Sequence, residues 1–285
     1  MTAPIHPQLP DLILEPMVRA ALLEDLGQYG DVTTRSVVPA RKTYEARLNA
    51  RSRGVVSGMQ VAALAFRMVD PGLRVETLVA DGAAVKPGET LMRISGSAAG
   101  ILSGERVALN FAGRLSGIAT LTAAYVAQTV SSKSRITCTR KTTPGLRIVE
   151  KQAVLHGGGF NHRIGLSDAI LIKDNHIAAA GGVRAVLERA RAVASHMMRT
   201  EIEVDTIKQL EEVLATGGAD VVLLDNMDTE TLRRAVALVA GRLITEASGK
   251  MTLERIAEVA ATGVDYISCG ALTHSAQTLD LGLDF

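Results

Sequence analysis

The chain has 285 residues, which is enough for one large domain or two domains of modest size. Hydrophobic residues make up 47% of the chain, so a sizeable core can form. The 31 basic and 30 acidic residues nearly cancel, which argues against a disordered chain and against a general nucleic-acid-binding protein. The aromatic content of 3% also argues against stacking platforms for single strands.

The cysteine content and the first residues bear on the compartment. Cys138 and Cys269 are too few for a disulfide scaffold, and we expect two buried thiols in a reducing compartment. Residues 1–10 have neither the basic start nor the apolar run of a signal peptide. No apolar stretch approaches the ~18 residues that span a membrane. We therefore expect a soluble, cytoplasmic protein with no membrane partner.

The first part of the chain mixes predicted helices and strands. Helical patterns cover residues 12–26, 60–69 and 101–130, and strand patterns cover residues 44–50 and short runs within 73–95. Gly113 and Gly117 interrupt the long helix, and since glycine weakens a helix, they predict close approach of another backbone segment. The turns within residues 81–91 are similar to those of biotinyl and lipoyl carrier domains. No hairpin tip presents a lysine there, so we interpret them as tight turns in a small sheet.

From about residue 135, short β-rich runs alternate with amphipathic helices. The runs cover residues 135–139, 169–172, 201–204, 221–224, 243–245 and 266–269. The helices cover residues 183–198, 206–216, 229–240 and 252–262, with Gly217, Gly241 and Gly263 at expected left-handed caps. Repeated βα units imply a parallel sheet that is buried on both faces. The spacing predicts an open, incomplete α/β barrel of about six strands.

Polar residues follow almost every predicted strand, at the end where α/β barrels carry their active sites. They are Arg140, Lys141, Lys173, Asp174, Asn175, His176, Asp205, Asp225, Asn226, Ser248, Gly249, Lys250 and Gly270, with Glu203 inside its strand. A barrel with only a structural role does not need these groups. Their joint placement therefore predicts an enzyme.

The segment from Lys133 to His176 is strongly basic, with eight lysines or arginines against three acidic residues. Arginine binds carboxylates and phosphates through two parallel hydrogen bonds. A pocket built from this segment therefore suits a ligand with several negative charges. A solvated basic surface is the alternative.

Two late loops predict a phosphate site. Residues 248–250 do not form a Walker A loop, because Ile244 and Met251 stand where that motif needs Gly and Ser or Thr. Their backbone amides precede a predicted helix and suit a monophosphate, as do those of residues 270–271.

The acids Glu203 and Asp225 follow two different strands. They could hold Mg²⁺ or ribose hydroxyls, stabilise a developing cation, or form ion pairs with pocket bases. His162 and His176 lack a spacing that unites metal ligands, so no transition-metal site is predicted.

Three stretches in the barrel half carry a family signature. They are Thr-Arg-Lys-Thr-Thr-Pro-Gly-Leu-Arg at 139–147, Gly-Gly-Gly-Phe-Asn-His-Arg at 157–163 and Leu-Ile-Lys-Asp-Asn-His at 171–176. Supporting stretches lie at 24–27, 115–120, 201–204, 224–226 and 270–274. In these motifs and their order, over nearly the whole chain, the sequence resembles the quinolinate phosphoribosyltransferase family.

The resemblance implies the fold and the reaction. It implies an N-terminal α/β sandwich domain over residues 1–114 and an open α/β barrel of type II phosphoribosyltransferase kind over residues 115–285, whose last residues pack back on the first domain. It implies a pentosyltransferase that converts quinolinate and phosphoribosyl pyrophosphate into nicotinate mononucleotide, pyrophosphate and CO₂ in de novo NAD biosynthesis. Mg²⁺ is the implied cofactor and a homodimer the implied assembly.

The resemblance also assigns residues to the site. The implied catalytic residues are Lys141, Lys173, Glu203 and Asp225, with Glu203 and Asp225 facing the ribose and Mg²⁺, in part through substrate and water. Quinolinate would be surrounded by Arg140, His162, Arg163, Lys173 and, from the partner subunit, Arg106. Lys141 would lie between quinolinate and the pyrophosphate. The remaining substrate-binding positions would be Thr139, Ser248, Gly249, Lys250, Cys269, Gly270 and Ala271, of which Ser248, Gly249 and Gly270 would hold the 5′-phosphate.

Two positions depart from the family pattern, and three alternatives stay open. Lys250 stands where Gly or Asn is usual, and Cys269 stands where a small apolar residue is common. A molybdenum-transport-associated relative of the same fold would use another acceptor. A Schiff-base aldolase would use Lys141 or Lys173, and a carrier protein would be modified within residues 81–91.

Overall fold

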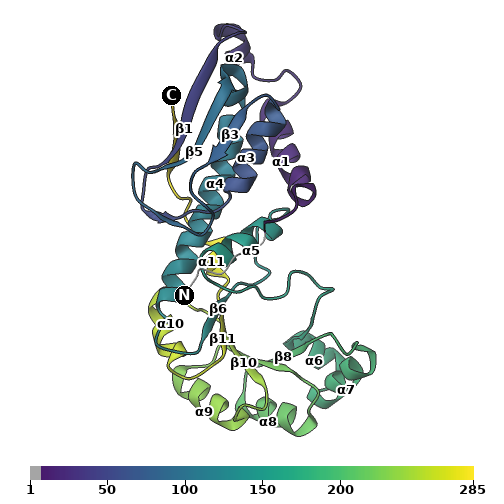
Figure 1. Ribbon diagram of the computed structural model, residues 1–285. Coiled ribbons are helices and arrows are strands. Elements are labelled where there is room, and N and C mark those ends of the chain that lie inside the picture. Colours follow the sequence, from purple (N-terminus) through teal and green to yellow (C-terminus); the bar gives the residue numbers. More distant parts are fainter. Residues whose placement is uncertain (1–7) are drawn as a thin grey trace. The chain divides into compact units, whose positions relative to one another are not determined.

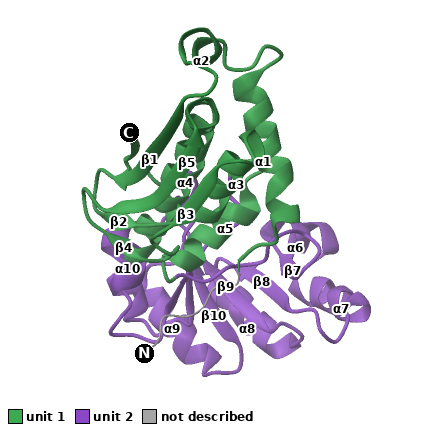
Figure 2. Ribbon diagram, turned by 45° about the horizontal axis from the view of Figure 1, so that its top comes forward, with its two compact units in different colours: residues 1–123, 143–158, 276–285 green, residues 124–142, 159–275 purple. Residues whose placement is uncertain are grey.

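The computed structural model describes residues 8–285. Residues 1–7, part of the segment in which no signal peptide is expected, lie outside the described residues. The chain divides into two compact units, shown in Figure 2. Unit 1 comprises residues 1–123, 143–158 and 276–285, and unit 2 comprises residues 124–142 and 159–275. The expected boundary lies between residues 114 and 115. In the structure each unit instead combines segments that are separated along the chain. No helix of the described residues has the length and apolar character needed to cross a bilayer.

Unit 1 combines a small antiparallel sheet with helices (Figure 1). Its helices are α1 (Asp11–Leu26), α2 (Val32–Val37), α3 (Met59–Val69), most of α4 (Ala98–Ala127) and α5 (Arg147–His156). Its strands are β1 (Thr43–Ala50), β2 (Gly54–Val55), β3 (Arg74–Thr77), β4 (Ala84–Val85), β5 (Thr90–Ser97) and β12 (Leu281–Asp284). The four-stranded sheet has the order β12-β1-β5-β3, and β2 pairs with β4.

The hydrophobic pattern explains how these elements pack. In β1, Ala46, Leu48 and Ala50 are buried and alternate with more exposed residues, as in a strand with one face on the core. The buried residues Leu14 and Val18 of α1 recur at helical spacing. The helices α1, α3 and α4 cover one face of the sheet (Figure 1).

The expected close approach at the glycines of α4 is confirmed. The backbone N–H of Leu279 donates to the carbonyl of Gly113 at 3.0 Å. A Cβ atom on Gly117 would overlap the carbonyl oxygen of Gln277. The two glycines therefore let the C-terminal segment lie directly on α4, next to the point where β12 pairs with β1.

Unit 2 is built from alternating strands and helices. Its strands are β6 (Arg135–Thr137), β7 (Ile170–Ile172), β8 (Thr200–Val204), β9 (Val221–Asp225), β10 (Ile244–Ser248) and β11 (Tyr266–Ser268). Its helices are α6 (Asp174–Ala180), α7 (Val183–Val193), α8 (Ile207–Thr216), α9 (Thr229–Val239), α10 (Leu253–Ala260) and α11 (Ala271–His274). The strands form one parallel sheet in the order β6-β11-β10-β9-β8-β7, which confirms the open α/β barrel.

The two faces of this sheet differ in composition. Ile202, Val204, Val222, Leu224 and Ile267 are fully buried, and in β8 they alternate with Glu201 and Glu203 and in β9 Leu224 precedes Asp225. The helices α8, α9 and α10 follow one another along the outer side of the sheet (Figure 1). The apolar side chains thus face the helices, and the alternate positions face the interior of the barrel.

We expect Gly117→Ala to destabilise the protein by about 2 kcal/mol or more, because the added Cβ would overlap backbone that has no free space to move into. Denaturant unfolding followed by circular dichroism measures this. The control is Asn110→Ala on the exposed side of the same helix, which should change stability by less than about 0.5 kcal/mol. Equal stability of the two variants would contradict the packing.

Candidate active site

The strand register places the predicted acids and strand-end residues on one face of the sheet. Glu203 pairs with Leu223, and Leu223 pairs with Glu246. One step nearer the carboxyl ends, Asp225 pairs with Ser248. Since alternate residues of a strand share a face, these side chains all point into the barrel. The carboxyl edge of this interior face is the candidate site.

The ends of β6 and β11 bring Lys141 and Gly270 together. A Cβ on Gly270 would lie 3.1 Å from Cδ of Lys141 and 3.1 Å from Nε2 of His274. The hydroxyl of Thr273 donates to the carbonyl of Lys141 at 2.7 Å. Gly270 thus leaves room for the Lys141 side chain, and His274 also lies against this glycine.

Two arginines of the site carry buried donors without acceptors. The Nε atoms of Arg140 and Arg163 are both buried and have no hydrogen-bond partner among the described residues. Burial, and next the positive charge of Arg140, lower the pKa of Arg163. The two guanidinium groups carry like charges, and each has a buried Nε–H without a hydrogen-bond partner among the described residues. This arrangement favours an anion that binds both groups.

Lys173 and Glu203 form an ion pair across neighbouring strands. Nζ of Lys173 lies 2.6 Å from Oε2 of Glu203. The backbone N–H of Lys173 donates to Nδ1 of His176 at 2.9 Å, which fixes the start of α6. Glu203 thus forms an ion pair with a basic residue of the pocket, which is one of the roles that the sequence left open. His176 caps the start of α6.

Acidic residues gather at the ends of β7, β8 and β9. Burial, and then the negative charges of Asp225 and Asp174, raise the pKa of Asp205. Crowded carboxylates of this kind are stabilised by a cation. Among residues 8–285, however, the only group of three side chains with converging metal-ligand atoms is His162, Glu201 and Glu246, which lies apart from Asp225. The acids at the strand ends therefore suit an ion that is held partly by other ligands.

The loop after β10 packs closely against the loop after β9. Gly249 has a φ of 91°, and a Cβ there would overlap the Asn226 side chain. The Arg255 guanidinium donates to the carbonyls of Gly249 at 3.3 Å and of Met227 at 2.7 Å. Arg255 therefore ties the loops after β9 and β10 together. The sequence did not indicate this role, because an arginine on a helix usually faces water.

Lys250 is held in an unusual backbone conformation. Its φ is 47°, in the left-handed region that favours glycine. Its side chain is exposed. The departure from the family pattern at this position therefore introduces backbone strain into the loop.

The remaining predicted residues lie in different surroundings. Thr139 accepts a hydrogen bond from the backbone N–H of Lys141 at 3.0 Å. Cys269 is buried, its thiol lies 3.8 Å from the carbonyl of Ile267, and burial raises its pKa far above the usual range. The Cys269 thiol is thus buried, and its role in substrate binding stays a prediction. Ala271 begins α11. Arg106 is an exposed residue of α4 in unit 1.

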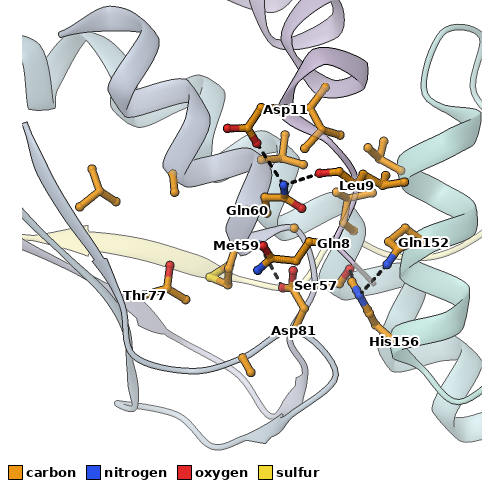
Figure 3. A pocket seen from close by; sticks show the side chains of 18 of the residues that line it. Gln8, Leu9, Asp11, Ser57, Met59, Gln60, Thr77, Asp81, Gln152 and His156 are labelled. Carbon is orange, nitrogen blue, oxygen red and sulfur yellow. Dashed lines mark hydrogen bonds between the residues drawn. The ribbon is translucent and has the colours of Figure 1, made fainter. Parts of the chain in front are cut away.

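Unit 1 contains a cavity of about 790 Å³, shown in Figure 3, which holds none of the predicted residues. Ser57 Oγ lies 2.8 Å from Nδ1 of His156, and Gln152 lies 3.3 Å from the other ring nitrogen. Asp81 accepts the backbone N–H of Met59 at 3.0 Å at the start of α3, and burial raises its pKa to about 6. These polar groups bind one another and the ends of α3 and α5.

The comparisons with known proteins agree over most of the chain. The family model described as the N-terminal domain of quinolinate phosphoribosyl transferase matches residues 31–116, and that of the C-terminal domain matches residues 118–284. A protein of Bacillus subtilis named probable nicotinate-nucleotide pyrophosphorylase (carboxylating) is 43% identical over 273 residues, which are 96% of this chain and 93% of that protein. The chloroplastic nicotinate-nucleotide pyrophosphorylase of Arabidopsis thaliana is 42% identical over 97% of this chain and 84% of its own length.

Solved structures give the same result. The crystal structure of NadC from Streptococcus pyogenes superposes with a TM-score of 0.94 at 39% identity and covers 98% of both chains. The nicotinate-nucleotide pyrophosphorylase of Francisella tularensis has a TM-score of 0.92 at 36% identity over 97% of both chains.

We expect Lys250→Gly to stabilise the protein by about 1 kcal/mol, because glycine adopts a positive φ without steric cost. Equilibrium unfolding in urea measures the change. Lys250→Ala is the matched control, since it removes the ammonium group and keeps the strain. If the alanine variant gained as much stability, charge repulsion rather than backbone strain would be the cause.

Proposed function

Because the chain belongs to the quinolinate phosphoribosyltransferase family, we propose that it transfers the phosphoribosyl group of phosphoribosyl pyrophosphate to quinolinate. The products are nicotinate mononucleotide, pyrophosphate and CO₂, and the reaction is a step of NAD biosynthesis. The chain is thus a decarboxylating pentosyltransferase.

The pair of buried, unused guanidinium donors on Arg140 and Arg163 is the observation that carries this proposal. Quinolinate bears two neighbouring carboxylates, and each can accept hydrogen bonds from a guanidinium group. Lys173, which follows β7 and pairs with Glu203, adds a third cation, and the resemblance places His162 beside them. The site can therefore hold the dianion in a fixed orientation, which favours attack by the pyridine nitrogen.

The acids of the barrel interior account for the first step. The bond from C1 of the ribose to the pyrophosphate oxygen breaks, and the bonding pair leaves with pyrophosphate. Positive charge develops at C1, where Glu203 and Asp225 can stabilise it. The pyridine nitrogen donates its lone pair to C1 and becomes cationic.

The cationic ring accounts for the second step. The bond between ring C2 and its carboxylate breaks, CO₂ leaves, and the bonding pair stays on the ring carbon, which then takes a proton. The arginines must not hold the departing carboxylate more tightly in the ground state than in the transition state.

The loops after β10 and β11 are proposed to bind the phosphates. The amides of Ser248, Gly249 and Gly270 would hold the 5′-phosphate, with Thr139 and Ala271 near it. Lys141, which lies against Gly270, would contact the departing pyrophosphate. Arg255 would keep the 5′-phosphate loop in place through the carbonyl of Gly249.

Mg²⁺ is the proposed cofactor. Mg²⁺ keeps several waters and binds through one or two carboxylates together with substrate phosphates. The separated carboxylates of Glu203 and Asp225, with the raised pKa of Asp205, fit this mode of binding. When bound, the ion would neutralise charge on the leaving pyrophosphate.

A homodimer with a shared site is the proposed assembly. Arg106 is an exposed cation on α4, and the resemblance implies that it completes the quinolinate site of the partner subunit. The cytoplasmic location stays a prediction, since the names of plant relatives place them in the chloroplast or the mitochondrion.

The reaction is tested directly with purified protein, Mg²⁺, phosphoribosyl pyrophosphate and either quinolinate or nicotinate. We expect nicotinate mononucleotide and equimolar CO₂ from quinolinate alone. Arg140→Ala should weaken quinolinate binding about a hundredfold in calorimetry, because a charge-assisted contact is lost. Arg189→Ala, an exposed arginine of α7, is the control. No product from either acid would favour the molybdenum-associated relative, and borohydride trapping would reveal an aldolase.

The shared site is tested by mixing inactive variants. Arg106→Ala and Lys173→Ala should each be inactive, and subunit exchange should restore roughly a quarter of the wild-type activity, because half of the dimers are mixed and each has one intact site. Lys173→Ala mixed with Arg140→Ala is the matched control and should stay inactive. Absence of rescue in the first mixture would argue against a shared site.

A further inference from the structure

Three groups of unit 2 hold the side chain of His162. Its Nε2 lies 2.9 Å from Oε2 of Glu201 and 3.6 Å from Oε1 of Glu246. Its Nδ1 accepts a hydrogen bond of 2.8 Å from the backbone N–H of Arg163. The side chains of His162, Glu201 and Glu246 are only 14%, 8% and 6% exposed, so water competes little for these contacts.

These contacts determine which ring nitrogen carries the proton. A nitrogen that accepts a hydrogen bond has no proton of its own, so in His162 the proton is on Nε2, which donates to Glu201. A substrate carboxylate that approached Nε2 would meet two acidic side chains. One that approached Nδ1 would meet a lone pair. The ring is therefore poorly suited to bind a carboxylate.

The loop that carries His162 is fixed on both sides of the ring. The backbone N–H of Phe160 donates to the carbonyl of Ile136 at 2.8 Å, which joins the loop to the end of β6. Beyond the ring, Arg163 donates from Nη1 to the carbonyl of Ala169 at 3.1 Å, just before β7. The ring of His162 attaches the middle of this span to β8 and β10.

We infer that His162 is a positioning residue, which with Glu201 and Glu246 fixes the backbone from which Arg163 reaches quinolinate, and that it does not bind quinolinate itself. This inference rests on the proposed function. It replaces the role of direct substrate ligand that the resemblance implies for His162.

A metal ion is the competing explanation for the same three side chains. Their donor atoms lie within 4.8 Å of one another, as metal ligands do. The surrounding charges favour hydrogen bonding without an ion. Arg163 faces the Glu201 charge, and burial, followed by the Glu201 charge, raises the pKa of Glu246 to about 7. A Glu246 carboxyl that is partly protonated near neutral pH reduces the negative charge that an ion would neutralise.

A double-mutant cycle separates positioning from direct binding. We expect His162→Ala to weaken quinolinate binding about tenfold in calorimetry, as for one lost hydrogen bond, and Arg163→Ala about a hundredfold. The double variant should bind within about twofold of Arg163→Ala, because His162 acts only through Arg163. A further tenfold loss in the double variant would show that His162 binds quinolinate directly and would overturn the inference.

Conservative variants keep the test independent of misfolding. His162→Asn retains an acceptor for the Arg163 N–H, so it should recover most of the affinity that His162→Ala loses. Glu201→Ala should raise the KM for quinolinate as much as His162→Ala does, with the KM for phosphoribosyl pyrophosphate unchanged. His196→Ala, an exposed histidine that follows α7, is the control. Equal effects on both KM values would overturn the inference.

The state of the ring gives a readout besides activity. In ¹⁵N–¹H spectra of the full chain, Nδ1 of His162 should be unprotonated both without and with saturating quinolinate. A shift of the proton to Nδ1 on binding would indicate direct contact, and stoichiometric Zn²⁺ binding that His162→Ala abolishes would indicate a metal site; either would overturn the inference. If wild-type protein bound no quinolinate, the proposed function would fail. The protonation of the His162 ring nitrogens in the protein alone would still test whether Glu201 and the Arg163 backbone N–H bind the ring.

Discussion

The alternation of side chains along the parallel strands of unit 2 is the constraint on which the site depends. A strand turns successive residues to opposite faces, so Ile202 and Val204 pack under the helices while Glu201 and Glu203 enter the barrel. One face supplies the apolar burial that holds the sheet together. The other face is then free to carry charges that contribute little to stability and provide the chemistry.

The charges on that inner face interact strongly with one another. Lys173 pairs with Glu203, and His162 bridges Glu201 and Glu246. The Nε donors of Arg140 and Arg163, by contrast, are buried and unpartnered among the described residues, which costs free energy in the protein alone. An anion that accepts these donors relieves this cost. The site is therefore built less for the stability of the chain than for selective binding of a ligand with several negative charges.

The sequence allowed much of the fold, and the strand edge that carries the candidate site, to be predicted, because both follow from periodicity. Strand and helix patterns located the barrel units, and the residues after each strand proved to share one edge. The resemblance implied that the last residues return to the first domain, where β12 lies. The assignment of α5 to unit 1 could not be predicted, since no local pattern states which distant segment a helix will contact. Glu246 was missed because a single acid within a short strand does not show that two other polar side chains will meet it. The helix expected over residues 183–198 ends at Val193, since the backbone becomes extended at Ala194.

The pairing of β12 with β1 has a consequence for synthesis on the ribosome. Leu281–Asp284 completes a sheet whose neighbouring strand, Thr43–Ala50, is made more than two hundred residues earlier. Until residues 281–284 are made, the nascent chain exposes the unpaired edge of β1, and such an edge readily pairs with foreign strands. Unit 2 contains neither strand and can form its parallel sheet first. The codons for residues 281–284 thus decide when β1 gains its second neighbour, and a ribosome that stalls before them leaves a chain in which β1 is an unpaired edge strand.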